Sequence, residues 1–502
     1  MKIGLIPLDE RPVNTRYPAM IAQIAGVDLC LPPTHLLSQF RQPADIDGLI
    51  GWLFEQAGGL DALIVSIEML GYGSLIASRI SQELPGEILA RLEALSKLKQ
   101  NHPRMELIGF NLITRVSNAD SAIEEPDYWA SEGRRFYQFS QLLDRLELGE
   151  PVSQELAELS GVLPANHIQD FLQRRLRNHT VNLAVIHLLA QGVLNGLVLS
   201  SDDTSPFGLP SSEKRHLGLW LRRLGLENRL LMYPGADEVG SALLARVFNQ
   251  QAGFAPAFRV SYAVPGGEAI VAPYEDSPVS VTIERQIRAV GGSIVAQKAD
   301  FWLAVNPPAP RRSEWSPEYA EQERNERLPY LKKMAAEIQQ RLEAGEAVIV
   351  ADVAYPNGAD PVLIELLLER VDITRLAAYG AWNTAGNTIG TALSQGCASR
   401  LARTPEQQSA QQRFLLHRFV EDWGYQQVVR RAAWRWLWNE YGRDELDAEI
   451  LPEVIAFITA GLERRIEQLP GFRDVFRLAS GSVRLPWNRL FEVDFELETA
   501  NH

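Results

Sequence analysis

Short apolar runs alternate with amphipathic stretches along most of the chain. The apolar runs are rich in Val, Ile and Leu and end in polar or Gly- and Pro-containing turns, which is typical of buried strands. The intervening stretches repeat apolar residues every three or four positions, as helices that pack on one face do. Strands are predicted at residues 2–8, 27–31, 62–67, 106–113, 194–200, 230–233, 258–264, 270–273, 293–297, 301–305, 347–350 and 376–379. This alternation predicts an α/β fold in which helices join mainly parallel strands.

Two long stretches interrupt the alternation. Residues 120–192 are predicted to be wholly helical, which is too long for a simple connection and indicates an insertion. From residue 404 onward the chain again has a helical pattern. We therefore predict an N-terminal α/β domain (1–254, with the insertion 120–192), a second α/β domain (255–403) and a C-terminal helical region (404–502). Two α/β units facing each other across a cleft are favoured, with the first unit possible as a barrel; a single barrel with insertions is the alternative.

The composition is that of a globular protein with ample material for a core. The chain has 502 residues, of which 46% are hydrophobic and 22% charged. Its net charge of −14 disfavours nucleic acid or an anionic membrane as the main partner. Cys30 and Cys397 give no disulfide framework and no zinc-site spacing. No apolar run approaches the roughly 20 residues that span a bilayer, and the start lacks signal-peptide features. A soluble cytoplasmic protein is expected.

A group of arginines and a group of tryptophans in the helical regions are interpreted as parts of the structure and not of a functional site. Arg174 and Arg175, with Arg177 close by, are interpreted as a solvated helix face. Trp434, Trp436 and Trp438 cannot all lie on one face, because a single face needs steps of three or four residues. We therefore predict that their helix is buried on several sides.

The carboxyl end of the predicted strand 194–200 carries two adjacent acids, Asp202 and Asp203. Open α/β sheets place their chemistry where parallel strands end. Adjacent carboxylates are costly to hold together unless they have a task or a cation. The alternative is a solvated turn in which one Asp caps the next helix.

Other predicted strands also end in polar or aromatic side chains, which right-handed crossovers would bring to one edge. We expect the following residues to bind a substrate there: Asp9, Arg11, Asn14, Glu68, Tyr72, Arg115, Asp237, Glu238, Trp382 and Asn383. This set is rich in carboxylates, amides and aromatic rings and poor in His and Cys. It disfavours Ser/His/Asp and Cys/His hydrolases, and the sequence has no phosphate-binding or dinucleotide-binding motif.

Carboxylates, amides and aromatic platforms together suit a sugar. The leading hypothesis is a carbohydrate-active hydrolase, a glycosidase acting on N-acetylhexosaminides without a cofactor. In a substrate-assisted mechanism Asp202 would orient the acetamido group and Asp203 would protonate the leaving oxygen. The expected partner is a small-molecule substrate, and the oligomeric state is not predicted.

Two alternatives stay open. Asp9, Asp202, Asp237 and Asp352 could hold Mg²⁺ or Mn²⁺, which favour oxygen ligands, in a metal-dependent hydrolase or lyase. Alternatively, two α/β lobes could close on a sugar without catalysis.

Five motifs together resemble a bacterial family known only as a domain of unknown function, DUF4127. They are Ile-Pro-Leu-Asp-Glu-Arg-Pro-Val-Asn (6–14), Arg-Val-Ser-Asn (115–118) with Glu-Glu-Pro-Asp-Tyr-Trp (124–129), Ser-Asp-Asp-Thr-Ser-Pro-Phe-Gly (201–208), Pro-Gly-Ala-Asp-Glu (234–238) and Trp-Asn-Thr-Ala-Gly-Asn-Thr (382–388). The resemblance covers nearly the whole chain and implies no activity. The tandem acid at 202–203 is also similar to the catalytic Asp-Asp of some β-N-acetylglucosaminidases.

Overall fold

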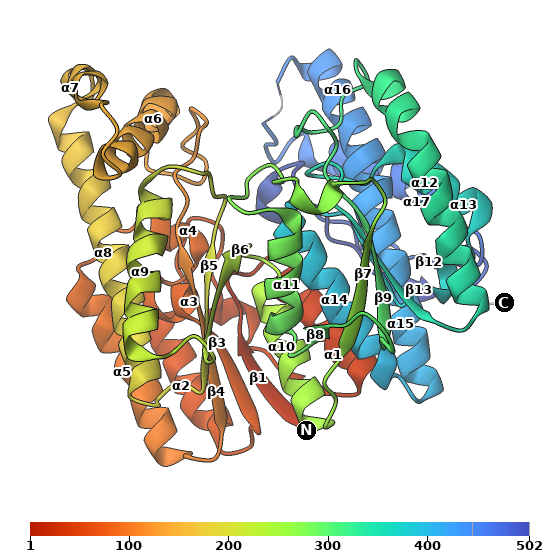
Figure 1. The fold of residues 1–502 in the computed structure, drawn as a ribbon, viewed down its shortest axis with the longest axis horizontal. Coiled ribbons are helices and arrows are strands. Elements are labelled where there is room, and N and C mark those ends of the chain that lie inside the picture. The colour runs from red at the N-terminus through yellow and green to blue at the C-terminus, as the bar shows by residue number, and fades with distance from the viewer. Residues whose placement is uncertain (444, 501–502) are drawn as a thin grey trace. The chain divides into compact units, whose positions relative to one another are not determined.

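A computed structural model describes residues 1–443 and 445–500, so position 444 and residues 501–502 of the predicted C-terminal region lie outside the described residues. In the described part, parallel strands form two separate sheets (Figure 1). The six-stranded sheet contains β1 (Lys2–Ile6), β2 (Asp28–Cys30), β3 (Ala62–Ser66), β4 (Glu106–Ile113), β5 (Gly196–Ser201) and β6 (Leu230–Pro234). The five-stranded sheet contains β7 (Ala257–Tyr262), β8 (Ser293–Ile294), β9 (Phe301–Asn306), β10 (Ala347–Asp352) and β11 (Ala378–Gly380).

The two sheets share one strand topology. The orders are β2-β1-β3-β4-β5-β6 and β8-β7-β9-β10-β11, so each sheet has its first strand between its second and third. This order is found in doubly wound α/β proteins, whose ligands bind beyond the carboxyl ends of the strands. Both sheets are open within the described residues, and the alternative of a single barrel is therefore wrong. The strand predicted at 270–273 is also wrong, since only an isolated bridge joins Val271 to Pro278.

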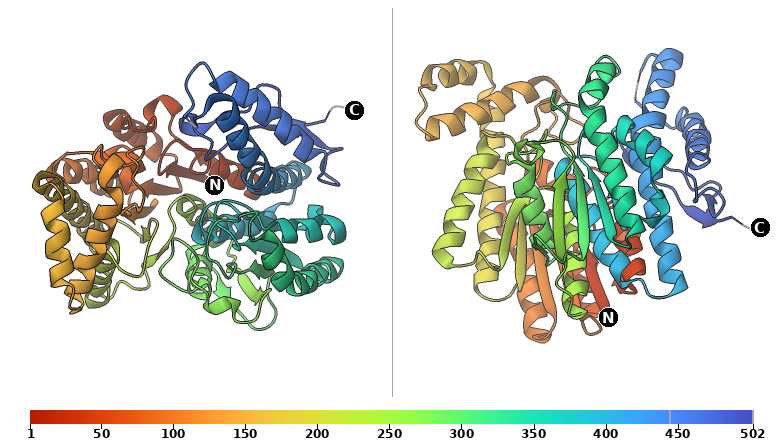
Figure 2. Two further views of the ribbon diagram at one scale, coloured as in Figure 1. Left: turned by 90° about the horizontal axis from the view of Figure 1, so that it is seen from above. Right: turned by 45° about the vertical axis from the view of Figure 1, so that its right-hand side comes forward.

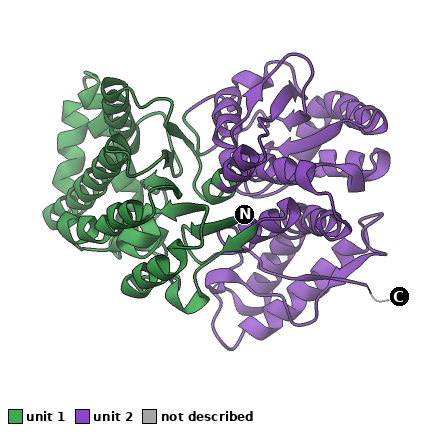
Figure 3. Ribbon diagram, turned by 90° about the horizontal axis from the view of Figure 1, so that it is seen from below, with its two compact units in different colours: residues 1–10, 28–243, 274–276 green, residues 11–27, 244–273, 277–502 purple. Residues whose placement is uncertain are grey.

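The chain forms two compact units (Figure 3). Unit 1 comprises residues 1–10, 28–243 and 274–276, and includes the six-stranded sheet. Unit 2 comprises residues 11–27, 244–273 and 277–502, and includes the five-stranded sheet. The domain boundaries predicted from the sequence at residues 254 and 403 stay a prediction.

In unit 1, the strand side chains alternate between the two faces of the six-stranded sheet. Helices pack against these side chains and bury them. Leu63 and Val65 of β3 pack in one core cluster with residues of six helices. On β1, Leu5 faces the opposite way and approaches Gly240. The six helices are α2 (Ile46–Ala57), α3 (Ile67–Tyr72), α4 (Leu75–Ile80), α5 (Pro85–Asn101), α8 (Ala165–Ala190) and α9 (Leu209–Leu224).

The long connection between β4 and β5 is helical only from Trp129, so the prediction of a wholly helical stretch over residues 120–192 is wrong for residues 120–128, which form turns and coil. It contains α6 (Trp129–Glu147), α7 (Ser153–Val162) and α8. Figures 1 and 2 show α6 and α7 beyond the ends of the strands. Trp129, Phe136, Phe139 and Phe171 form a separate aromatic core there. The insertion is thus anchored by α8 and carries its own small core.

In unit 2, helices cover both faces of the five-stranded sheet. Val348 and Val350 of β10 pack in one cluster with α12 (Ala320–Glu343) and α13 (Pro361–Arg370). Ile349 points to the other face and lies against Gly396 of α14 (Ala385–Leu401), which also contacts α1 (Arg16–Ala25) and α11 (Val279–Ala289). None of the described helices is both long and apolar enough to cross a membrane.

The remaining helices of unit 2 belong to the C-terminal region. Helix α15 (Pro405–Arg418) continues through a π-helical segment (Phe419–Val429) into α16 (Arg430–Tyr441), and α17 (Leu451–Ile466) packs against the π-helical segment. The strands β12 (Phe476–Leu478) and β13 (Leu497–Thr499) form an antiparallel pair near the end.

The prediction that α16 is buried on several sides is wrong. Trp434 and Trp438 are 46% and 51% exposed, and their rings stack at a centroid distance of 5.8 Å. The buried residues of α16 are Ala433 and Leu437, which lie four positions apart on one narrow face. Trp436 stacks on Phe457 of α17 instead.

Candidate functional site

Asp202 and Asp203 follow β5 directly, at the carboxyl end of the strand, as predicted. Neighbouring backbone fixes this turn, because Asp202 donates its N–H to the carbonyl of Ile113 and Thr204 donates to that of Tyr274. Asp203 has a φ of +36°, in a region that non-glycine residues rarely adopt. Such a conformation persists only where the surroundings impose it, which is common at functional sites.

Two arginines pair with the tandem acid. Nη2 of Arg79, on α4 (Leu75–Ile80), lies 2.5 Å from Oδ2 of Asp202. Nη1 of Arg115, just after β4, lies 2.8 Å from Oδ2 of Asp203. Both guanidinium groups also donate to Oε2 of Glu124, at 2.6 and 3.0 Å. Arg115 donates in addition to Glu125. We call these six residues the acid–arginine cluster; it sets four carboxyl groups against two guanidinium groups.

The two acids differ in environment. The Asp202 side chain is 9% exposed, whereas that of Asp203 is 32% exposed. Burial, together with the negative charge of Asp202, raises the pKa of Asp203 to about 6, while Arg115 opposes the shift. Asp203 is therefore the more accessible acid of the pair and takes up a proton close to neutral pH.

Helix α8 holds the segments that carry Arg79 and Arg115. Arg175 donates to the carbonyl and hydroxyl oxygens of Thr114 and pairs with Glu213 on α9. Arg177 donates to the carbonyl of Ser78 at 2.7 Å, near the end of α4. Both arginines are buried, so their interpretation as a solvated helix face is wrong: their charges are compensated by carbonyl groups and a carboxylate.

Glu68, predicted to bind substrate, is buried in the first turn of α3, which follows β3 directly. Its Oε1 accepts hydrogen bonds from Nδ2 of Asn111 at 2.6 Å and from the N–H of Leu112 at 2.7 Å. Burial raises the pKa of Glu68 to about 7. These bonds tie the end of β3 to β4, and contact with a substrate stays a prediction.

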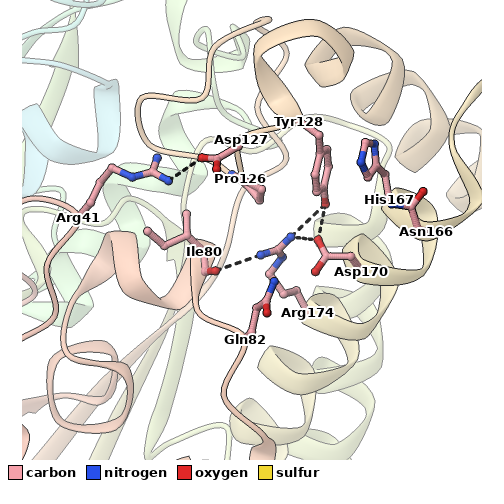
Figure 4. A pocket seen from close by; sticks show the side chains of 10 residues that line it. All are labelled: Arg41, Ile80, Gln82, Pro126, Asp127, Tyr128, Asn166, His167, Asp170 and Arg174. Atoms are coloured by element: carbon pink, nitrogen blue, oxygen red, sulfur yellow. Dashed lines mark hydrogen bonds and ion pairs between the residues drawn. The ribbon is translucent and has the colours of Figure 1, made fainter.

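Tyr72 is also buried, with the guanidinium group of Arg177 5.0 Å from its ring centre. It lines a cavity of about 490 Å³ together with Arg41 and Ile80. The same two residues line a second cavity, of about 360 Å³, which we call the Tyr128 cavity (Figure 4).

The segment 124–129 joins the acid–arginine cluster to the Tyr128 cavity. Glu124 and Glu125 belong to the cluster, whereas Pro126, Asp127 and Tyr128 line the cavity. Trp129 anchors the segment in the aromatic core of the insertion. On the other side, Arg79 of the cluster is followed directly by Ile80 of the cavity wall. The cavity and the cluster are therefore neighbours along two segments of unit 1.

The other predicted site residues of unit 1 are Asp9, Asp237 and Glu238, all of them buried. Glu238 accepts a hydrogen bond from the N–H of Ala236 at 3.0 Å, just before α10 (Val239–Gln251). Gly235, with a φ of +138°, leaves room for the Glu238 carboxylate, which a β-carbon there would strike.

Four predicted site residues belong to unit 2: Arg11, Asn14, Trp382 and Asn383. Nη1 of Arg11 lies 2.8 Å from Oε1 of the buried Glu492. Trp382 is buried after β11, and its carbonyl accepts the Thr388 hydroxyl. Asn383 has a φ of +59°. Their roles in substrate binding stay predictions.

Asp352 belongs to a buried polar network at the carboxyl ends of β9 and β10 in unit 2. It accepts hydrogen bonds from Nδ2 of Asn306 at 2.8 Å and from the N–H of Asp360 at 2.7 Å. Arg327 pairs with Asp360 at 2.8 Å. Burial and the charge of Asp360 raise the pKa of Asp352 to about 7.

The acids suggested as metal ligands are divided between the two units. Asp9, Asp202 and Asp237 belong to unit 1 and Asp352 to unit 2. Across residues 1–443 and 445–500, no three His, Cys, Asp or Glu side chains are grouped so that they could hold a metal ion. The metal-dependent alternative stays a prediction.

Sequence reasoning did not assign Glu124 or Glu125 to the site, and it did not pair Arg79 with Asp202. Arg79 and Asp202 are 123 residues apart, and no local pattern pairs them. The available signal was charge balance, because two adjacent buried acids call for nearby cations.

Comparison with known proteins gives one informative match. No curated protein and no solved structure matches the chain significantly. The model of a family described as protein of unknown function, DUF4127, matches residues 3–496. Since that match spans nearly the whole sequence, the chain belongs to the DUF4127 family.

Proposed function

We propose that the protein is a carbohydrate-active hydrolase that cleaves N-acetylhexosaminides, with Asp203 as the proton donor. The observation that carries this proposal is the difference between the paired acids. Asp203 is partly accessible and has a pKa raised to about 6 by burial, while Asp202 is buried against Arg79. Neighbouring carboxyl groups whose environments differ in this way can take the acid and the orienting role in one reaction.

In the proposed reaction, protonated Asp203 donates its proton to the glycosidic oxygen as the bond from that oxygen to the anomeric carbon breaks. The carbonyl oxygen of the substrate's acetamido group bonds to the anomeric carbon in the same step, and Asp202 accepts a hydrogen bond from the acetamido N–H. Water then attacks the anomeric carbon and gives a proton back to Asp203, which restores both the acetamido group and the acid.

Arg115 has a defined part in this scheme. Once Asp203 has lost its proton, its carboxylate lies 2.8 Å from the Arg115 guanidinium group. A charge-assisted hydrogen bond stabilises the charged form of the acid. Arg115 therefore lowers the cost of proton donation without reacting itself.

The proposal is tested with a panel of nitrophenyl glycosides and N-acetylglucosamine oligomers. We expect turnover by the wild type and a loss of about 10²- to 10⁴-fold in kcat for Asp203→Asn on the oligomers, whose leaving groups need protonation. Asp202→Asn should lose activity on N-acetylated sugars. The matched control is Asp120→Asn, which alters a surface pair with Arg134. No turnover on any sugar, or equal turnover by the wild type and Asp203→Asn, would contradict the proposal.

A second candidate is a non-catalytic sugar-binding protein. The observation that favours it is that both acids of the pair are bound to arginines, as in a static ion-pair network. Sugar binding measured by calorimetry without release of any product would support this candidate over the hydrolase.

A further inference from the structure

The wall of the Tyr128 cavity contains an oriented imidazole, that of His167 on α8. Its Nδ1 lies 2.8 Å from Oε2 of Glu132 on α6. Its ring stacks on that of Tyr128, with a centroid distance of 4.4 Å and an angle of 11° between the planes (Figure 4). Because a carboxylate only accepts hydrogen bonds, Nδ1 of His167 is the donor. In the neutral ring Nε2 is then an acceptor held in a fixed direction.

The charged groups that line the cavity are already paired. Arg41 lies 3.2 Å from Oδ1 of Asp127. Arg174 pairs with Asp170 and donates to the carbonyl of Ile80 at 3.1 Å. These two arginines and two aspartates give the lining no net formal charge. A phosphate or another anion would have to break an existing ion pair in order to bind.

Arg174 and Arg41 also hold the walls in place. Arg174 donates to the Tyr128 hydroxyl at 3.1 Å, and that hydroxyl donates to Asp170 at 2.8 Å. Arg41 donates to the carbonyl of Glu125 at 3.0 Å. These bonds fix the Tyr128 ring and the 124–128 segment, so the cavity is formed before any ligand enters.

Several neutral or accepting groups are left for a ligand. Besides Nε2 of His167, they include the side-chain amides of Asn166 and Gln82, which make no hydrogen bond within the described residues. The Asp127 carboxylate is 96% exposed. Amides, a carboxylate and an imidazole acceptor beside the apolar wall of Ile80 match the alternating hydroxyl groups and C–H faces of a sugar.

We infer that the Tyr128 cavity is a binding subsite for a neutral sugar residue, with His167 Nε2 accepting one of its hydroxyl groups. The subsite is distinct from the Asp202–Asp203 pair but adjoins the acid–arginine cluster through residues 79–80 and 124–126. In its choice of ligand class the inference rests on the proposed function. A sugar chain long enough to contact both this cavity and the adjoining acid–arginine cluster makes more contacts than a single sugar, so oligosaccharides bind better than monosaccharides.

The test is calorimetric titration of N-acetylglucosamine, its dimer and trimer, glycerol and inorganic phosphate into the full-length protein. The wild type should bind the trimer at least about tenfold more tightly than the monomer, and should bind neither phosphate nor glycerol measurably. His167→Ala should lose at least about tenfold in trimer affinity. The matched control His187→Ala changes an exposed histidine on the same helix and should bind as the wild type does.

Two further measurements separate binding from catalysis and from folding. Asp203→Asn should keep its affinity for the trimer even where turnover is lost, so failure of the hydrolase proposal leaves the subsite testable. Imidazole ¹⁵N signals of the wild-type protein should show the His167 resonance shifting when the trimer is added, which needs no variant. Preferred binding of phosphate, equal affinity of His167→Ala and wild type, or the absence of any sugar binding at millimolar concentration would each overturn the inference.

Discussion

The guanidinium group of Arg115 lies 2.8 Å from the Asp203 carboxylate and also donates to Glu124 and Glu125. One guanidinium group therefore interacts with three carboxyl groups. Its positive charge lowers the pKa of Asp203 and so opposes the effects of burial and of the Asp202 charge, which raise that pKa to about 6. Arg115 thus sets the pH at which the accessible acid of the pair changes its protonation state.

Replacing Arg115 by Gln should raise the pKa of Asp203 by about one unit or more, because the opposing positive charge is lost. An acid that donates its proton is active below its pKa, so wild-type turnover should fall as the pH rises through about 6. In Arg115→Gln this decline should move to higher pH. The measurement is the pH dependence of kcat, with Arg134→Gln as the surface control. An unchanged position of the decline would show that Arg115 does not control Asp203.

Arg79 should contribute far more to stability than an exposed arginine with the same kind of partner. Its side chain is buried and pairs with Asp202 and Glu124. Arg79→Ala would leave the buried Asp202 without its cation and Glu124 with Arg115 alone, at a cost of about 3–5 kcal/mol. Arg324, which pairs with Glu365 at the surface of unit 2, is the matched comparison, and its alanine variant should lose less than about 1 kcal/mol. Urea unfolding followed by circular dichroism measures both, and similar losses would contradict the burial argument.

The sequence predicted the strands and helices well where the apolar pattern decides the structure. Strand β4 begins and ends at the predicted residues 106 and 113, and every residue after its first is buried. The strand predicted at 270–273 failed because a short apolar run can equally pack as a turn. The prediction that α16 is buried on several sides was wrong for another reason. The spacing of the tryptophans shows which residues share a face of the helix, but not whether another element covers that face.

The candidate site could be predicted only in part. The position of Asp202 and Asp203 at the end of a parallel strand followed from the strand–helix alternation. The partners of the two acids could not be predicted, because Arg79 is 123 residues from Asp202 and lies on α4, whereas Asp202 follows β5. Arg175 and Arg177 show the same limit, since a charged residue is expected to be exposed until the carbonyl groups that satisfy it are known.

Gly133 of α6 should tolerate no side chain. A β-carbon there would lie 2.1 Å from the carbonyl oxygen of Ala119 and 2.6 Å from the Trp129 ring. Gly133→Ala should therefore destabilise the insertion by about 1–3 kcal/mol, although alanine favours a helix. At Gly161 of α7 a β-carbon would have no other atom within 4 Å, and Gly161→Ala should stabilise by about 0.5–1 kcal/mol. Thermal melts of the two variants should shift in opposite directions; a shift in the same direction would refute the packing argument.

The π-helical segment in unit 2 carries a buried group of charges around Glu421. Arg418 pairs with Glu421 and with Asp422, and the Tyr17 hydroxyl of α1 donates to Glu421. Burial, together with the charges of Asp422 and of the buried Glu492, raises the pKa of Glu421 to about 8, while Arg418 opposes the shift. Glu421 therefore keeps a proton in the folded protein at pH values where it loses that proton on unfolding.

This difference makes stability depend on pH in a predictable direction. A carboxyl group with a raised pKa stabilises the folded state fully below its unfolded pKa, near 4.5, and that stabilisation is lost as the pH rises through about 8. In the wild type, the free energy of unfolding should fall between pH 5.5 and 8, with Glu421 contributing up to about 1.4 kcal/mol per pH unit. Glu421→Gln removes the titrating group but keeps its shape, so its unfolding free energy should fall less steeply. The control is Glu463→Gln, at an exposed position of α17. Urea unfolding at half-unit pH steps measures the three slopes, and a Glu421→Gln slope equal to that of the wild type would show that Glu421 does not hold a proton in the folded protein.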